Sequence, residues 1–421
     1  MSCGPSSGRS RSLPVGRLAT LGDEGFRLFF PLSALYLALF PTVWVIAWGF
    51  DLPLATQVPP SLWHGHEMLV GGFGAALIGF LTTAAPEWTD TEPPRGAILW
   101  KLAALWAIGR VVGFLGWDTL GALGALVDLT WLLALLVFVL RVSWKKRTDK
   151  LLAFAFWIVV LTGCVAFTRW QFYCGDTLRA SQGLNLVGFA YLGLLGLALA
   201  RITVPVTNLV LDPSERTSPF RPHPGRLHLA PGLVLVAMIG QMLELSPAVC
   251  AYLTLAVGCA FIDRVAEAFI GREAFRSEIL LLSGSSALAG LGLLLLAFAE
   301  LGAPWSAVGG LHIAFMGGLG LAVFAVLCIA GLLHTNRPLE LSVTLKLGGM
   351  ALIASIVLRV APDFGFALPD QSHAVASLLW ASAFLIWTVA NWSALSRVDE
   401  PGEYNERTQQ PVATAWNQAA E

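Results

Sequence analysis

Long apolar stretches follow one another along almost the whole chain, and they constrain its fold more than any other feature. A helix needs about 20 mostly apolar residues to cross a bilayer, and the sequence holds about twelve such stretches. Only 13% of the residues are charged, against about 25% in soluble domains. We therefore predict an all-α integral membrane protein with about twelve transmembrane helices. The expected spans are 28–50, 66–85, 97–116, 119–140, 151–168, 183–204, 229–246, 248–270, 279–299, 305–333, 341–361 and 374–396.

Arginine and lysine are distributed unevenly between the loops that connect these spans. Because cytoplasmic loops are enriched in both residues, the pattern predicts that both termini face the cytoplasm and that the number of spans is even. We expect one membrane domain at 23–398 between disordered cytoplasmic tails at 1–22 and 399–421. The net charge of −1 gives no reason to expect nucleic acid as a partner. The basic loop positions on the expected inner side include Arg95, Arg141, Lys145, Lys146, Arg216, Arg272, Arg337 and Arg397, whereas the outer loops hold only Arg169 and Arg179 clear of the spans.

Several ionisable residues lie inside the expected spans or at their edges. Charge is costly there, so each such residue is a candidate for function. His64 and His66 begin the second span from the outside, and His312 lies near the outer end of the tenth. Arg110 in the third span could pair with Asp128 in the fourth, or it could contact a ligand. His64 could bind a metal, or it could be an interfacial residue beside a tryptophan.

The second and tenth spans share a pattern in which histidine is followed by glycine at the fifth, sixth and eighth positions and by alanine at the tenth. Both spans are expected to run from outside to inside, so the two histidines would lie at one depth in the outer half of the membrane. The alternative is chance, or an old duplication without function, in a chain with 42 glycines. The matching residues are His66, Gly71, Gly72, Gly74 and Ala76 in the second span and His312, Gly317, Gly318, Gly320 and Ala322 in the tenth.

The functional interpretation of this quasi-repeat is a cofactor site. Small residues below the histidines, among them Gly74 and Gly320, would let a flat, bulky group lie against the backbone. Two imidazoles on opposite faces of a planar macrocycle bind a b-type haem. His66 and His312 are therefore the candidate pair, and Met316 is an alternative axial ligand on the face of His312.

His334 is a separate candidate at the expected inner end of the tenth span. It follows His312 by about 33 Å along a continuous helix, so it could bind a metal or another polar ligand from inside, or simply cap the helix. The sixth span also runs inward and is rich in glycine. Three pseudo-repeated arcs of four helices, with the second, sixth and tenth spans equivalent, would resemble the plan of the haem–copper oxidase core. The copper-binding histidines of that family are missing from the sixth and seventh spans here.

Several motifs resemble the NnrS family of bacterial membrane proteins, in order over residues 22–396. The most specific are the second-span motif from Trp63 to Met68 and the motif from His334 to Leu339. Departures from the family pattern are Glu87, where asparagine is usual, and Asn336, where glycine is usual. The other matching stretches are Gly25–Pro31, Ala85–Thr89, Gly109–Arg110, Arg201–Pro205 and His312.

This resemblance implies a haem-containing protein of the bacterial inner membrane, with copper as a second candidate cofactor and a link to denitrification, nitric oxide and nitrosative stress. His64 and His66 could serve different groups, because two residues turn a helix by about 200°. The protein would then bind nitric oxide or another small ligand, or accept electrons from a donor. A small-molecule or metal transporter and a membrane scaffold for metalloenzyme assembly are the alternatives. Catalysis is left open.

Overall fold

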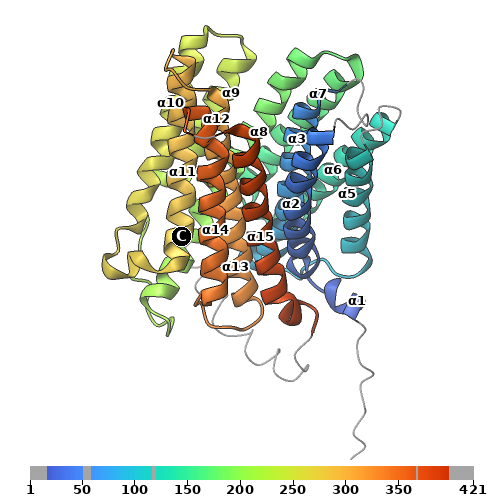
Figure 1. The fold of residues 1–421 in the computed structure, drawn as a ribbon. Coiled ribbons are helices and arrows are strands. Elements are labelled where there is room, and N and C mark those ends of the chain that lie inside the picture. Colours follow the sequence, from blue (N-terminus) through green and yellow to red (C-terminus); the bar gives the residue numbers. More distant parts are fainter. Residues whose placement is uncertain (1–16, 51–57, 116–119, 367, 398–421) are drawn as a thin grey trace, which may run out of the picture.

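The structure, a computed structural model, describes residues 17–50, 58–115, 120–366 and 368–397. Every regular element in these ranges is helical, and the long helices stand side by side in one bundle (Figure 1). The α-helices are α1 (Arg17–Leu21), α2 (Gly25–Phe50), α3 (Pro60–His66), α4 (Gly74–Thr89), α5 (Ala97–Leu115), α6 (Gly121–Lys146), α7 (Leu152–Cys174), α8 (Thr177–Leu211), α9 (Arg226–Met242), α10 (Pro247–Asp263), α11 (Ser277–Glu300), α12 (Ala307–His312), α13 (Leu321–Leu333), α14 (Val343–Val360) and α15 (Pro369–Leu395). The wider π-helices are η1 (Glu67–Phe73) and η5 (Ile313–Gly320), and the 3-10 helices are η3 (Arg264–Ala268), η4 (Gly271–Phe275) and η6 (Ala361–Phe364).

Ten helices within the described residues are long and apolar enough to cross a membrane. Helix α5, which carries Lys101 and Arg110, and α9, with 17 residues, are not among the ten. Large apolar side chains such as Leu126, Met350 and Val389 point outward and are 59–78% exposed, as expected of a surface that contacts lipid. The prediction of an all-α multi-pass membrane protein is confirmed. The count of twelve spans and the orientation stay predictions.

The start of α2 and the end of α15 lie at the same end of the bundle. The Arg27 guanidinium donates to the carbonyl oxygens of Ala394 and Leu395, each at 3.1 Å. This is also the end at which α1 lies (Figure 1), and we call it the inner end because the sequence predicts it to face the cytoplasm. Most of the predicted tails lies outside the described residues; within the first tail, residues 17–21 form α1.

Three helical segments, α3–η1–α4, α8 and α12–η5–α13, form the interior of the bundle. They correspond to the second, sixth and tenth expected spans. In their most apolar stretches, 83%, 72% and 72% of the residues are buried, against at most 61% in the other seven candidate spans. A central position for these three is the arrangement that three arcs of four helices would produce.

The histidine–glycine quasi-repeat corresponds to a repeated structure. In both copies the helix changes to a π-helix directly after the histidine, at Glu67–Phe73 and at Ile313–Gly320. A serine from the neighbouring long helix then donates to the carbonyl of the equivalent glycine, Ser33 to Gly72 and Ser285 to Gly318, each at 2.9 Å. Short π-helical turns are rare and often occur at functional sites. Two of them at equivalent positions, with equivalent serine partners, indicate that the spans around them are structurally related.

We expect Ser33→Ala and Ser285→Ala to lower the free energy of unfolding by similar amounts, about 1 kcal/mol each. Both changes leave a buried carbonyl of a π-helix without its side-chain donor. Denaturant unfolding in detergent, followed by tryptophan fluorescence, measures the loss. Ser283→Ala is the matched control, because the Ser283 hydroxyl bonds only to the Ile279 carbonyl of its own helix. An effect of Ser283→Ala as large as the other two would contradict the role given to the π-helix carbonyls.

Candidate functional site

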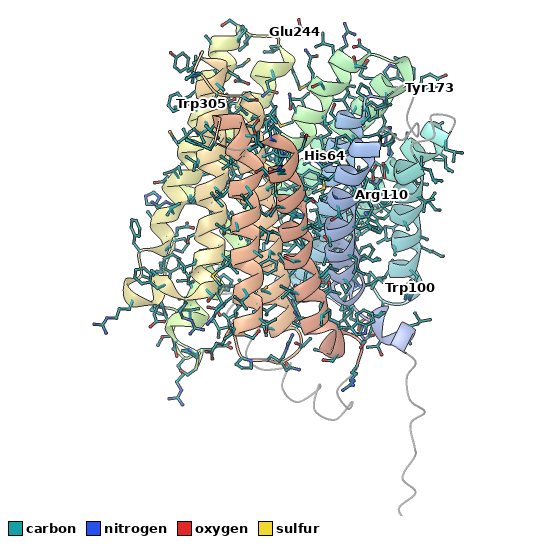
Figure 2. All side chains as sticks on the ribbon, viewed as in Figure 1. His64, Trp100, Arg110, Tyr173, Glu244 and Trp305 are labelled. Atoms are coloured by element: carbon teal, nitrogen blue, oxygen red, sulfur yellow. The ribbon has the colours of Figure 1, made fainter. Side chains whose placement is uncertain are left out.

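Four polar side chains from four helices gather at the outer end of the bundle, and we call them the outer histidine cluster. They are His64 on α3, His312 on α12, Arg359 on α14 and His373 on α15. The Arg359 guanidinium lies 3.1 Å from His373 Nε2, and His312 is within electrostatic range of the other three residues. Figure 2 shows His64 in the upper part of the bundle, among the helices.

Two of these imidazoles have a ring nitrogen that makes no hydrogen bond. His312 Nδ1 lies 2.8 Å from the Val308 carbonyl oxygen. A carbonyl can only accept, so Nδ1 carries the proton and the Nε2 lone pair is free for a ligand. His64 Nδ1 is buried without a hydrogen-bond partner. The His64 ring stacks on Trp44, with ring centroids 4.9 Å apart, and lies parallel to Phe40 at 6.2 Å.

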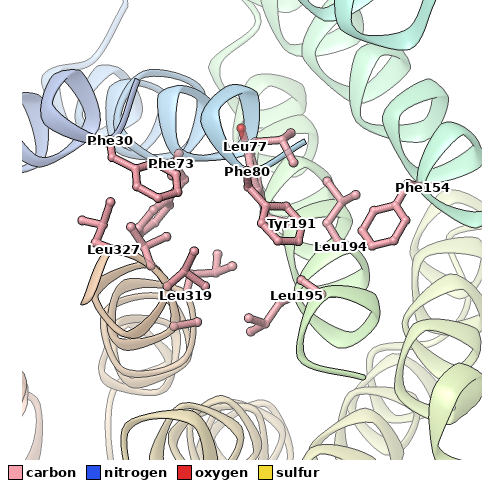
Figure 3. Close-up of a pocket in the computed structure, with 15 residues that line it drawn as sticks. Phe30, Phe73, Leu77, Phe80, Phe154, Tyr191, Leu194, Leu195, Leu319 and Leu327 are labelled. Carbon is pink, nitrogen blue, oxygen red and sulfur yellow. The ribbon is translucent and has the colours of Figure 1, made fainter. Parts of the chain in front are cut away.

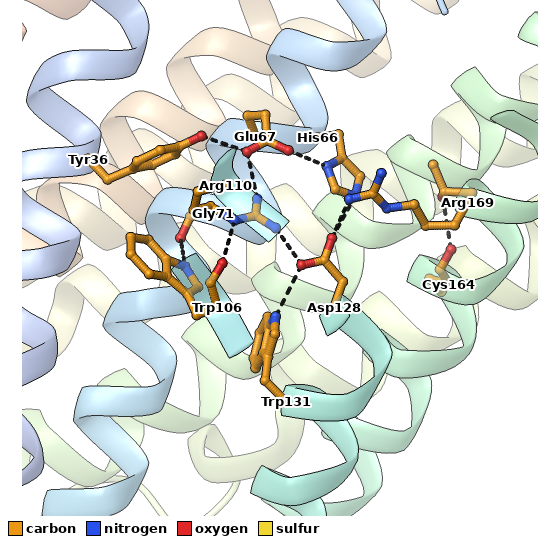
Figure 4. Close-up of polar contacts among 11 residues, drawn as sticks. Tyr36, His66, Glu67, Gly71, Trp106, Arg110, Asp128, Trp131, Cys164 and Arg169 are labelled. Carbon is orange, nitrogen blue, oxygen red and sulfur yellow. Dashed lines mark hydrogen bonds and ion pairs between the residues drawn. The ribbon is translucent and has the colours of Figure 1, made fainter. Parts of the chain in front are cut away.

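His66 belongs to a different group, a buried ionic cluster of His66, Glu67, Arg110, Asp128 and Arg169 (Figure 4). Arg110 donates to a Glu67 carboxylate oxygen at 2.7 Å and to Asp128, and Arg169 donates to the second oxygen of Asp128. His66 Nδ1 lies 3.1 Å from the other Glu67 oxygen. Two carboxylates and two guanidiniums balance, so the group is neutral when His66 is neutral. This balance is what makes so many ionisable groups tolerable inside a membrane protein.

Hydrogen bonds from aromatic residues fix the ionic cluster in place. Tyr36 donates its hydroxyl to Glu67 at 2.6 Å, and the Trp131 indole donates to Asp128 at 3.3 Å. His66 Nε2 is left without a hydrogen-bond partner, 3.8 Å from an Asp128 oxygen. A histidine that donates one nitrogen to a carboxylate and keeps the other free is a common arrangement for a metal ligand.

The structure brings together some of the residues predicted from sequence and separates others. Arg110 pairs with Asp128, which was one of its two predicted roles. His312 lies near His64, and no interaction of the described residues joins it to His66. The reason is the helical turn of about 200° between the two histidines of α3. His66 faces Asp128 of α6 and Phe172 of α7, whereas the His64 ring stacks on Trp44 of α2.

Comparison of the sequence with known families shows which family the chain belongs to. Residues 20–398 match the family described as NnrS protein. The chain belongs to the NnrS family. No curated protein matches the chain. The match covers nearly all described residues, so both the outer histidine cluster and the buried ionic cluster lie within the NnrS domain.

Three other candidates, Gly74, Gly320 and Met316, contact neighbouring side chains within this NnrS domain. A Cβ atom at Gly74 would lie 3.2 Å from the Trp131 indole, and one at Gly320 would overlap the Trp380 indole. The flat groups against these glycines are therefore tryptophan rings. Met316 packs on the apolar cluster that includes Ile356 of α14.

His334 lies at the opposite, inner end, where it ends α13. Its Nδ1 is 3.2 Å from a Glu87 carboxylate oxygen, and its ring stacks on Phe26 with centroids 4.9 Å apart. These contacts tie α13 to α4 and α2. Glu87 is one of the positions at which the sequence was expected to depart from the family pattern, and its carboxylate pairs with His334.

Sequence reasoning missed the role of Arg169. It placed Arg169 in an outer loop beyond a span ending at 168, but α7 continues to Cys174 and the Arg169 side chain is buried against Asp128. The signal was present in the apolar residues that follow, such as Phe172. Arg359 and His373 lie against each other, within electrostatic range of His312. No group of three or more His, Cys, Asp or Glu side chains in the described ranges is arranged to hold a metal ion.

Proposed function

We propose that the chain is a haem-binding protein of the bacterial inner membrane, and that His64 and His312 bind the haem iron in the outer half of the membrane. The observation that carries the proposal is that His64 of α3 and His312 of α12 lie within electrostatic range of each other and that each has a ring nitrogen without a hydrogen-bond partner. Membership of the NnrS family supports a function related to nitric oxide. A haem bound there would supply an iron that binds nitric oxide or another small ligand and exchanges electrons with a donor.

The residues present fit such a group by their chemistry. Neutral imidazole is a common axial ligand of haem iron, and the Val308 carbonyl fixes the tautomer and orientation of His312. Trp44 and Phe40 offer apolar rings beside His64. The Arg359 guanidinium, 3.4 Å from Asp363, provides positive charge that could also hold a carboxylate substituent. The pair His66 and His312 is the alternative, because His66 Nε2 is also free.

Copper is the second candidate cofactor. Protein sites for copper use several histidine, cysteine or methionine ligands together, and no such group of three His, Cys, Asp or Glu is assembled among the residues that the structure covers. The imidazoles that are proposed to bind haem iron would therefore also have to bind copper. Metal analysis of the purified protein, with iron and copper measured per chain, separates the two.

Haem content of the purified protein tests the proposal. We expect wild type in mild detergent to show a b-type reduced-minus-oxidised spectrum that changes on titration with nitric oxide. His312→Ala should abolish the spectrum or convert it to a high-spin form, since the iron loses one of two nitrogen ligands. His334→Ala is the matched control at the inner end and should leave the spectrum unchanged. Well-folded wild type without haem, even after haem supplementation, would refute the proposal.

A further inference from the structure

A cavity of about 80 Å³ lies in the interior of the bundle, and we call it the central cavity. Its walls come mainly from α4, α8 and α13 with the end of η5, the three central segments, and Phe30 of α2 and Phe154 of α7 complete them (Figure 3). The cavity is therefore built by the same three segments that the three-arc plan makes equivalent. Neither the outer histidine cluster nor the buried ionic cluster contributes a lining residue.

The lining of the central cavity is apolar. Tyr191 is its only lining residue with a polar side-chain atom, and that hydroxyl lies against Gly74, 3.6 Å from where a Cβ atom would be. A buried water needs two to four polar partners, and apolar cavities without them stay dry and take up apolar molecules. The volume would admit several waters, since one needs roughly 10–15 Å³ by the same kind of measure. The walls offer such waters at most one polar partner, the Tyr191 hydroxyl, which is buried without a hydrogen-bond partner.

Aromatic side chains pack around the central cavity toward the inner end. Phe80 and Phe154, which line it, both contact Trp88, with ring centroids 5.7 and 5.3 Å apart. Phe30 contacts Phe26, on which His334 stacks. Above the cavity, Tyr191 and Gly74 lie beside Trp131, whose indole donates to Asp128. The space therefore lies between the buried ionic cluster and the ring-lined inner end.

We propose that the central cavity is a binding site for a small, uncharged, apolar molecule of the size of a diatomic gas. Such a molecule dissolves in the bilayer and gains dispersion contacts from the aromatic and aliphatic walls without losing hydrogen bonds. A volume of about 80 Å³ is enough for a molecule of this size. The proposal does not depend on haem binding, because no residue of the outer histidine cluster takes part.

Xenon is the probe that tests the site, measured by ¹²⁹Xe NMR on the full chain in detergent and in lipid nanodiscs. We expect saturable binding to wild type. Ala322→Leu fills the cavity from α13 and should abolish the bound-xenon signal. Ala104→Leu is the matched control, since Ala104 is exposed on the lipid-facing side of α5, and it should bind xenon as wild type does. Leu195→Ala enlarges the cavity from α8 and should increase the bound fraction.

Several results would overturn the proposal. One is the absence of saturable xenon binding in wild type. Another is binding that appears only after delipidation, which would assign the space to a lipid acyl chain. If Ala322→Leu does not give a cooperative melting curve, Leu195→Ala decides, and an unchanged bound fraction in that variant refutes the site. None of these measurements depends on haem content. A negative result for the central cavity is therefore distinct from a negative result for the proposed haem site.

Discussion

Replacing Asp128 with asparagine is expected to lower the free energy of unfolding by about 3–5 kcal/mol, because the change leaves buried charge uncompensated. Asp128 accepts from Arg110 through one oxygen and from Arg169 through the other, and its side chain is fully buried. Asparagine keeps the shape but removes the negative charge that both guanidiniums need. Denaturant unfolding of the purified variant in detergent measures the loss.

Two companion variants make the Asp128 result specific. Asp263→Asn breaks the ion pair with Arg226, but Asp263 is 46% exposed, so a loss of only about 0–1 kcal/mol is expected. Adding Arg169→Gln to Asp128→Asn removes one of the unpaired charges and should recover part of the stability. Equal losses for Asp128→Asn and Asp263→Asn would show that the buried ionic cluster does not stabilise the bundle.

Gly292→Ala is expected to be the other severe change, with a loss of about 3 kcal/mol or more. Helix α11 crosses the end of α12 and the start of η5 so closely that a Cβ atom at Gly292 would overlap the amide nitrogen of Ala314 and lie 2.6 Å from the Gly310 carbonyl oxygen. These are backbone atoms, so no side-chain rotation can relieve the clash. Small residues allow this kind of close approach between membrane helices. The two helices must separate, and α12 carries His312.

The expected result therefore has two parts: a lower unfolding free energy and a loss of whatever His312 binds. Gly163→Ala is the matched control, because nothing lies within 4 Å of a Cβ atom at that position in α7. It should be neutral or slightly stabilising. Thermal unfolding followed by tryptophan fluorescence compares the two alanine variants under one set of conditions. A Gly292→Ala protein as stable as Gly163→Ala would mean that α11 and α12 do not pack this closely.

Much of the fold follows from hydropathy alone. The expected span 305–333 corresponds to α12, η5 and α13 together, and 66–85 falls within the α3–η1–α4 segment. Length and apolar character suffice here because a bilayer imposes both on any crossing helix. The quasi-repeat also has structural meaning, since each histidine is followed by a π-helix.

The site was harder to infer from sequence, because it depends on the direction in which each side chain faces inside the bundle and not only on its depth in the membrane. Sequence spacing placed His66 and His312 at the same depth, but the rotation of α3 turns His66 toward Asp128 and leaves His64 nearer His312. Hydropathy does not report which way a side chain faces inside a bundle. Arg169 shows a related difficulty. A charged residue near the end of an apolar stretch resembles a loop residue until its buried partner on another helix is known.

Spectra of His64→Ala and His66→Ala, recorded side by side with wild type, test the proposed site most directly. If His64 and His312 bind the iron, His64→Ala loses the low-spin b-type spectrum. His66→Ala should keep that spectrum and show only a lower unfolding temperature, since it perturbs the buried ionic cluster. The reverse pattern, with the spectrum lost in His66→Ala and kept in His64→Ala, would contradict the account and assign the ligand to the other histidine of α3.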